Sequence, residues 1–134
     1  MDNPMSLKDR VVVITGAAQG IGRGVATKAA SLGAQLVLID INEDGAQETA
    51  ELLGGNIDVY AGSVADAGFV QDAIEKTVVK HGAIHGLFNN AGIIRTAMIH
   101  KMSLADWQAV IDVNLTGVFH CLQAVGRHMI ERAK

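Results

Sequence analysis

Apolar and polar residues alternate along the chain with two different periods, and each change of period predicts a boundary between a strand and a helix. Four short runs of mostly apolar residues are typical of strands buried on both faces. They are Val11–Ile14, Gln35–Asp40, Ile57–Ala61 and Ile84–Phe88. Between them, apolar residues recur every three or four positions, which predicts amphipathic helices. The expected order is β-α-β-α-β-α-β-α-α.

Capping residues indicate where these helices begin and end. Asn42, Asp66 and Ser103 each precede a helical pattern and can accept a hydrogen bond from its first turn. Gly33 is placed to end the first helix. The expected helices span about 20–32, 43–53, 67–81 and 104–110. A final long helix carries an apolar face made of Leu115, Val118, Phe119, Leu122, Val125 and Met129.

The alternation of strands and helices predicts a parallel sheet with right-handed crossovers and helices on both faces. The expected class is a Rossmann-like, doubly wound α/β fold with strand order 3-2-1-4 in this chain. In such a sheet the ligand crevice lies beside strands one and four, at their carboxyl ends. We expect residues 6–134 to form one domain of this class. Residues 1–5 are expected to be a disordered lead or a vector-derived remnant.

A glycine-rich turn joins the first strand to the first helix, with Gly16, Gly20 and Gly22 as its glycines. The first turn of a helix has unpaired N–H groups and carries the positive end of the helix dipole. Glycines let the backbone approach a phosphate with no Cβ in the way. The position between a strand and a helix favours a dinucleotide site over a plain turn with packing glycines.

Asp40 ends the second strand, roughly 20 residues beyond the glycine turn. A carboxylate there can accept hydrogen bonds from the adenosine ribose hydroxyls and would repel a 2′-phosphate. Residues 17–19 and 41–42 offer no basic side chain, and Arg23 lies past the turn on the first helix. The pattern therefore favours NAD over NADP. The alternative is a solvated acid in a loop.

Two further motifs lie at 89–92, which reads N-N-A-G, and at 113–117, which reads V-N-L-T-G. Together with T-G-x-x-x-G-I-G at 15–22, they resemble the classical short-chain dehydrogenase/reductase family. Each motif also has a plainer interpretation. The asparagines and glycine of the first can be turn formers, and Asn114 can cap or kink a helix junction.

The resemblance implies hydride transfer between a nicotinamide and an alcohol or carbonyl carbon of a small molecule, with NAD as cofactor. It implies that Asn114 is a catalytic residue, which helps to hold a water connected to a catalytic lysine. Ser63 departs from the family, which often has an aspartate there to bond the adenine amino group. The implied cofactor-binding residues are Gly16, Ala18, Gln19, Gly20, Ile21, Gly22, Asp40, Ile41, Ser63, Val64, Asn90, Ala91 and Gly92.

The family's catalytic Tyr-x-x-x-Lys does not occur in this sequence. Tyr60 is the single tyrosine, and Val64 stands four residues after it. The resemblance therefore covers only the amino-terminal half of the family. It implies that residues 6–134 are an incomplete NAD-binding Rossmann domain, truncated before the later strands, and we expect the chain to be inactive alone. The alternative function is a non-catalytic dinucleotide-binding or assembly module. Asn114 favours the enzyme, because such a module has no evident use for it.

The composition limits the kinds of binding partner and the cellular compartment that we expect for this protein. A net charge of −3 without a basic cluster disfavours nucleic acid. No apolar run looks long enough to cross a membrane, and the start does not resemble a signal peptide. Cys121 is the single cysteine, and the five histidines show no metal-ligand spacing. We expect a cytoplasmic protein without a bound metal. The open fourth strand and the uncovered apolar helix face predict a homo-oligomer.

Overall fold

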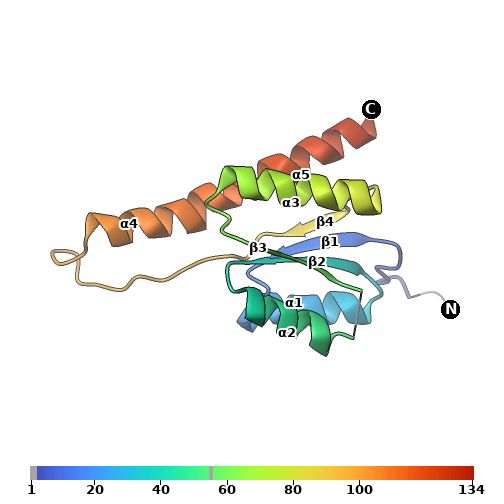
Figure 1. The fold of residues 1–134 in the computed structure, drawn as a ribbon, viewed down its shortest axis with the longest axis horizontal. Coiled ribbons are helices and arrows are strands. Elements are labelled where there is room, and N and C mark those ends of the chain that lie inside the picture. Colours follow the sequence, from blue (N-terminus) through green and yellow to red (C-terminus); the bar gives the residue numbers. More distant parts are fainter. Residues whose placement is uncertain (1–2, 55) are drawn as a thin grey trace.

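A computed structural model describes residues 3–54 and 56–134. Four parallel strands form one sheet in the order β3-β2-β1-β4, as the sequence predicts. The strands are β1 (Val11–Thr15), β2 (Gln35–Asp40), β3 (Asp58–Ala61) and β4 (Gly86–Phe88). Two helices cover each face of the sheet (Figure 1). They are α1 (Gly20–Ser31) and α2 (Glu43–Leu52) on one face, and α3 (Ala67–His81) and α5 (Gly117–Ala133) on the other.

The core consists of two apolar layers, one on each side of the sheet. Successive strand residues point to opposite faces, so each strand contributes to both layers. Val13 and Val37 are paired across β1 and β2 and are fully buried in the layer under α3 and α5. Ile14 and Leu38 are the next pair and lie in the layer under α1 and α2. This explains why these strands are continuous apolar runs.

The expected caps are confirmed. The side chains of Asn42, Asp66 and Ser103 each accept a backbone N–H bond from the first turn of α2, α3 and α4 (Leu104–Val110), respectively. Gly33 follows α1 with φ +94°, which suits glycine. The lead expected over residues 1–5 stays a prediction, and Met1 and Asp2 lie outside the described residues.

β4 is two residues shorter than expected, and two histidine side chains accept backbone N–H groups near its start. The N–H of Val11 donates to the Nδ1 atom of His85 at 2.9 Å, and the N–H of Ile84 donates to Nε2 of His128 at 3.1 Å. The ladder with β1 therefore begins at Gly86. The third strand likewise begins at Asp58, one residue later than expected.

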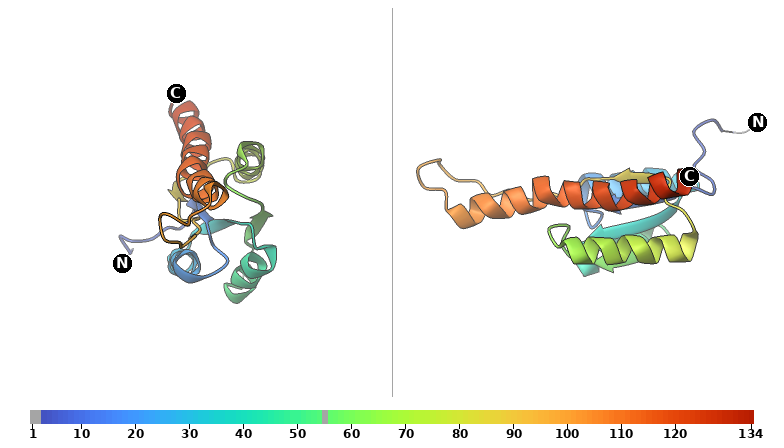
Figure 2. Two further views of the ribbon diagram at one scale, coloured as in Figure 1. Left: turned by 90° about the vertical axis from the view of Figure 1, so that its left-hand side faces the viewer. Right: turned by 90° about the horizontal axis from the view of Figure 1, so that it is seen from above.

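The last two expected helices are in fact one continuous helix, Leu104–Ala133 (Figure 2). Between α4 and α5 the backbone stays helical through a π-helical segment, Ile111–Thr116, so the expectation of two separate helices is wrong. This helix is long and apolar enough to cross a membrane by length and composition alone, contrary to our expectation. Core helices of water-soluble proteins meet the same criterion.

Much of the large apolar face of α5 is uncovered, as expected, and the buried stripe of the helix is narrow. It consists of Gly117, Cys121 and Val125, at four-residue spacing. A Cβ on Gly117 would lie 2.5 Å from Cγ2 of Val64, so the helix can approach the loop after β3 only because this residue is glycine. As a result, Leu115, Phe119 and Leu122 are 65, 55 and 61% exposed.

Candidate functional site

A cleft of about 450 Å³ lies at the carboxyl ends of the strands. The glycine turn, the end of β2, the loop after β3 and the N-N-A-G segment form its walls. Every predicted cofactor-binding residue except Gly22 lines this cleft. Those residues are Gly16, Ala18, Gln19, Gly20, Ile21, Asp40, Ile41, Ser63, Val64, Asn90, Ala91 and Gly92. The structure thus brings together segments that are up to about 75 residues apart in the sequence.

The start of α1 differs from the starts of α2, α3 and α4, because its backbone N–H groups are not capped. Gln19 is extended and makes no side-chain cap bond, and the first turn contains no acidic residue. Gly20 has φ +57°, and a Cβ there would meet no atom within 4 Å. The turn therefore presents free donors and the positive end of the helix dipole on an open surface, which suits an anion such as a diphosphate.

Gly16 and Gly22 have a different role, because they let the turn fold tightly. A Cβ on Gly22 would lie 2.0 Å from the carbonyl oxygen of Gly16. A Cβ on Gly16, which has φ +69°, would lie 2.8 Å from Nδ2 of Asn90. Gly22 consequently packs against the backbone of Gly16 and does not line the cleft.

The N-N-A-G segment ties the end of β4 to the end of β1. The buried hydroxyl of Thr15 accepts the N–H groups of Asn90 and Ala91, both at 2.9 Å. Nδ2 of Asn90 donates to the carbonyls of Thr15 and Gly16 at 3.3 Å, while Asn89 bonds the carbonyl of Val118 on α5. The side chain of Asn90 therefore joins the ends of the two strands, whereas Asn89 bonds the helix.

Asp40 is half-buried at the end of β2 and is held by two backbone groups. Its Oδ2 accepts the N–H of Ala18 at 2.9 Å, and its Oδ1 accepts the N–H of Asn42 at 2.9 Å. A carboxylate oxygen can accept more than one bond, so both oxygens keep acceptor capacity toward the cleft.

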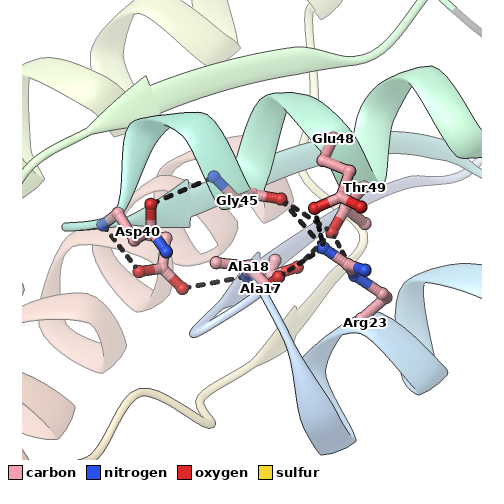
Figure 3. A network of polar contacts seen from close by, with 8 residues as sticks. Ala17, Ala18, Arg23, Asp40, Gly45, Glu48 and Thr49 are labelled. Carbon is pink, nitrogen blue, oxygen red and sulfur yellow. Dashed lines mark hydrogen bonds and ion pairs between the residues drawn. The ribbon is translucent and has the colours of Figure 1, made fainter.

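Arg23 does not turn toward this cleft. Its guanidinium bonds the carbonyls of Ala18 and Gly45, the hydroxyl of Thr49 and the carboxylate of Glu48 (Figure 3). The only arginine near the turn is therefore already engaged within the described residues.

Asn114 lies outside the cleft lining, in the π-helical segment. Its Oδ1 accepts the N–H of Ile93 at 2.8 Å, and its Nδ2 donates to the carbonyl of the same residue at 2.9 Å. Ile93 itself lines the cleft. Asn114 thus clamps the chain that follows the N-N-A-G segment. Ser63, also on the cleft wall, accepts the N–H of Ala65 at 3.1 Å through its hydroxyl.

Two further histidines have polar partners, and the cysteine is buried. His81 pairs with Asp58, and Nδ1 of His120 donates to the carbonyl of Val64. Burial raises the pKa of the Cys121 thiol to about 11, so it stays protonated at neutral pH. Among residues 3–54 and 56–134, no group of three or more His, Cys, Asp or Glu could hold a metal ion.

Sequence reasoning missed two buried threonines that support the cleft. Thr15 accepts the N–H bonds described above, and Thr49 donates to the carbonyl of Ala17 at 2.8 Å. Both carried a signal, because each is a polar residue where an apolar one is expected. Thr15 ends a buried strand, and Thr49 lies on the buried face of α2 beside Ala46 and Ala50.

Comparison with known proteins agrees with this geometry. The sequence profile described as "short chain dehydrogenase" matches residues 10–134. D-threitol dehydrogenase of Mycolicibacterium smegmatis is 39% identical over 134 residues, which cover 98% of this chain and 52% of that protein. The 3-oxoacyl-[acyl-carrier-protein] reductase FabG of Thermotoga maritima is 43% identical, with 96% and 53% covered.

Solved structures give the same result. A short-chain dehydrogenase/reductase from Burkholderia phymatum, solved in complex with NAD, has a TM-score of 0.91 and 33% identity. It is covered over 47% of its length, by 96% of this chain. A short-chain type dehydrogenase/reductase from Mycobacterium marinum also has a TM-score of 0.91, with 30% identity and coverage of 96% and 53%. The chain spans about half the length of these relatives. The family profile matches nearly all of the chain, and the chain belongs to the short chain dehydrogenase family.

Proposed function

We propose that this chain forms the coenzyme-binding half of an NAD-dependent oxidoreductase that acts on a small alcohol or carbonyl compound. The observation that carries the proposal is Asp40 at the cleft, held by the N–H groups of Ala18 and Asn42 with acceptor capacity left over. NAD, when bound, supplies the carbon that accepts or donates a hydride.

The residues present fit a dinucleotide. The uncapped start of α1 and the open position at Gly20 suit the diphosphate. Asp40 suits the hydroxyls of the adenosine ribose. Ser63 and Val64 form the wall opposite the glycine turn, where we assign the adenine. The neutral Ser63 hydroxyl would bond the adenine in place of the family's usual aspartate.

Two features support NAD rather than NADP. Asp40 would repel a 2′-phosphate at short range, since both carry negative charge. Arg23, which could otherwise neutralise such a phosphate, already bonds Ala18, Gly45, Thr49 and Glu48.

We assign Asn114 to the catalytic side of the protein. Its clamp on Ile93 fixes the edge of the cleft beyond Gly92, on the side away from Asp40. The π-helical segment that carries Asn114 supports this role, because such segments occur frequently at functional sites. The sequence has no Tyr-x-x-x-Lys, and we assign proton transfer to groups outside these 134 residues.

The test is the variant Asp40→Ala, with Asp44→Ala as its control. Asp44 is an exposed acid in the first turn of α2, close in sequence but not part of the cleft lining. Loss of charge-assisted bonds to the ribose should weaken NAD binding by about 10- to 100-fold in Asp40→Ala, as measured by isothermal titration calorimetry. Asp44→Ala should bind as the wild type does. Equal NAD affinity in all three proteins would overturn the proposal.

A further inference from the structure

A chain of hydrogen bonds runs behind the cleft wall from Arg23 to Asp40 (Figure 3). Nε of Arg23 donates to Oγ1 of Thr49 at 2.8 Å, and the Thr49 hydroxyl donates to the carbonyl of Ala17 at 2.8 Å. The same peptide unit carries the N–H of Ala18, which donates to Oδ2 of Asp40 at 2.9 Å. A cation thus stands at one end of this relay and a carboxylate at the other.

The direction of each bond is fixed by the groups present. A threonine hydroxyl has one proton. Ala17 offers the nearer acceptor, at 2.8 Å, while the carbonyl of Gly45 is 3.1 Å away and also receives Nη2 of Arg23 at 3.2 Å. Every donor therefore points from Arg23 toward Asp40. Bonds aligned in this way polarise one another.

Burial makes the relay rigid. Thr49 and Ala17 are fully buried and Ala18 is 4% exposed, so water cannot replace the missing partner if one bond is removed. Nη2 of Arg23 also donates to the carbonyl of Ala18 at 2.7 Å, which holds the next peptide unit of the turn. Both peptide units next to the Cα of Ala18 are consequently fixed from α1 and α2.

We propose that Thr49 and Arg23 are positioning residues for recognition of the adenosine 2′-hydroxyl. Neither residue lines the cleft, so each acts through the Ala18 peptide. Oδ1 of Asp40 is held locally by Asn42, but Oδ2 depends on the N–H of Ala18 from another segment. Loss of the relay frees this peptide to tilt, and the carboxylate loses the orientation that the ribose requires. The inference rests on the proposed function.

The experiment compares binding of NAD and of its 2′-deoxyadenosine analogue by the protein at its full encoded length, using calorimetry. The ratio of the two dissociation constants reports ribose recognition alone. In the wild type NAD should bind about tenfold tighter than the analogue, as expected for one hydrogen bond to a charged group. In Thr49→Val this ratio should fall to about threefold or less, while affinity for the analogue changes less than about twofold. Thr49→Ser, which keeps the hydroxyl, should restore the ratio.

Two control variants match the chemistry of the change. Thr77→Val removes a buried hydroxyl that bonds the carbonyl four residues earlier in α3, on the other face of the sheet from the relay. Glu48→Gln removes the exposed ion pair of Arg23 and leaves its other bonds. Both should keep the wild-type ratio. Arg23→Met tests the other end of the relay and should lower the ratio as Thr49→Val does.

The outcomes separate the two proposals. If the wild type binds no NAD, the proposed function fails, and the inference fails with it. If the wild type binds NAD selectively but Thr49→Val and Arg23→Met keep its ratio, only the inference is overturned. Equal loss of affinity for both ligands would also overturn it, because that is the effect of a merely structural residue. Should Thr49→Val not fold, the ratio in Arg23→Met decides.

Discussion

Two regions of the molecule differ in how completely their polar groups are hydrogen-bonded and their apolar side chains are buried within this chain. Around β1, β2 and α2, polar groups bond one another in a closed set, from Arg23 through Thr49 to Asp40. At β4 and α5, by contrast, large apolar side chains such as Phe119 and Leu122 are more than half exposed. The edge strand β4 has three residues and, in the part of the chain that the structure describes, pairs with β1 alone, as β3 at the other edge pairs with β2 alone. The coenzyme end is therefore self-contained, whereas the α5 end leaves a surface that favours further contacts.

This difference indicates which steps, coenzyme binding or catalytic turnover, the residues of this chain can support by themselves. The adenosine and diphosphate contacts that we propose all come from segments of this chain whose backbone is held by its own hydrogen bonds. The acid/base chemistry of the family has no candidate residues here apart from Asn114. We therefore expect coenzyme binding to be separable from turnover, and the following predictions test the two ends separately.

The largest effect is expected in the glycine turn. Gly22→Ala places a Cβ 2.0 Å from the Gly16 carbonyl, and the backbone there cannot retreat. We expect a loss of about 3 kcal/mol in the free energy of unfolding. Gly24→Ala, two residues on in the same helix, meets no atom within 4 Å and should gain about 0.5–1 kcal/mol. Urea denaturation measures both, and equal stability of the two variants would contradict the account.

A smaller effect separates the two faces of α5. Val125→Ala removes two methyl groups from a residue that is 2% exposed and should cost about 2 kcal/mol. Leu122→Ala, at 61% exposure, should change the stability of the 134-residue chain by less than about 0.5 kcal/mol at micromolar concentration. If Leu122→Ala costs as much, and the cost grows with protein concentration, the exposed face is covered by a second copy under those conditions.

The smallest effect concerns pH at the start of β4. Burial, together with the positive charges of Arg132 and Arg10 and the neighbouring His128, lowers the pKa of His85. Its Nδ1 must stay unprotonated to accept the N–H of Val11. Because the unfolded chain binds this proton more readily, stability should fall as the pH drops below about 6.5 and be unaffected by this group above that.

The variant His85→Asn isolates this contribution, because its Oδ1 can accept the same N–H at every pH. We expect the difference in urea midpoint between pH 7.5 and pH 5.5 to shrink in His85→Asn relative to the wild type. His100→Asn, in an exposed loop, serves as the control and should leave the difference unchanged. If His85→Asn shows the same difference in urea midpoint as the wild type, the acid sensitivity belongs to other groups.

Local rules were enough to predict most of the fold. The caps at Asn42, Asp66 and Ser103 depend on residues three positions apart, and the buried strands depend on consecutive apolar residues. The glycine turn and Asp40 follow from the same short-range logic. These features could be predicted because their partners lie close in the sequence or obey a fixed topology.

The unpredicted features depend on contacts between distant segments or on the local geometry of a helix. The partners of Thr49 and Arg23 in the relay lie 26 to 32 residues away, so a polar residue on a buried helix face marks Thr49 as unusual but does not identify its partners. The buried stripe of α5 could not be predicted, because it is set by Gly117 packing on Val64 and not by the largest apolar residues. The π-helical segment removed the expected break between α4 and α5, because the chain stays helical with no glycine or proline there.

The most direct test of the central claim is a calorimetric titration of the 134-residue chain with ADP-ribose and with NAD. The coenzyme contacts assigned here are to the adenosine and the diphosphate, so both ligands should bind saturably, with affinities within about threefold of each other. Asp40→Ala should weaken both. A folded chain that binds neither ligand, or that binds NAD more than about tenfold tighter than ADP-ribose, would contradict a self-contained coenzyme half-site.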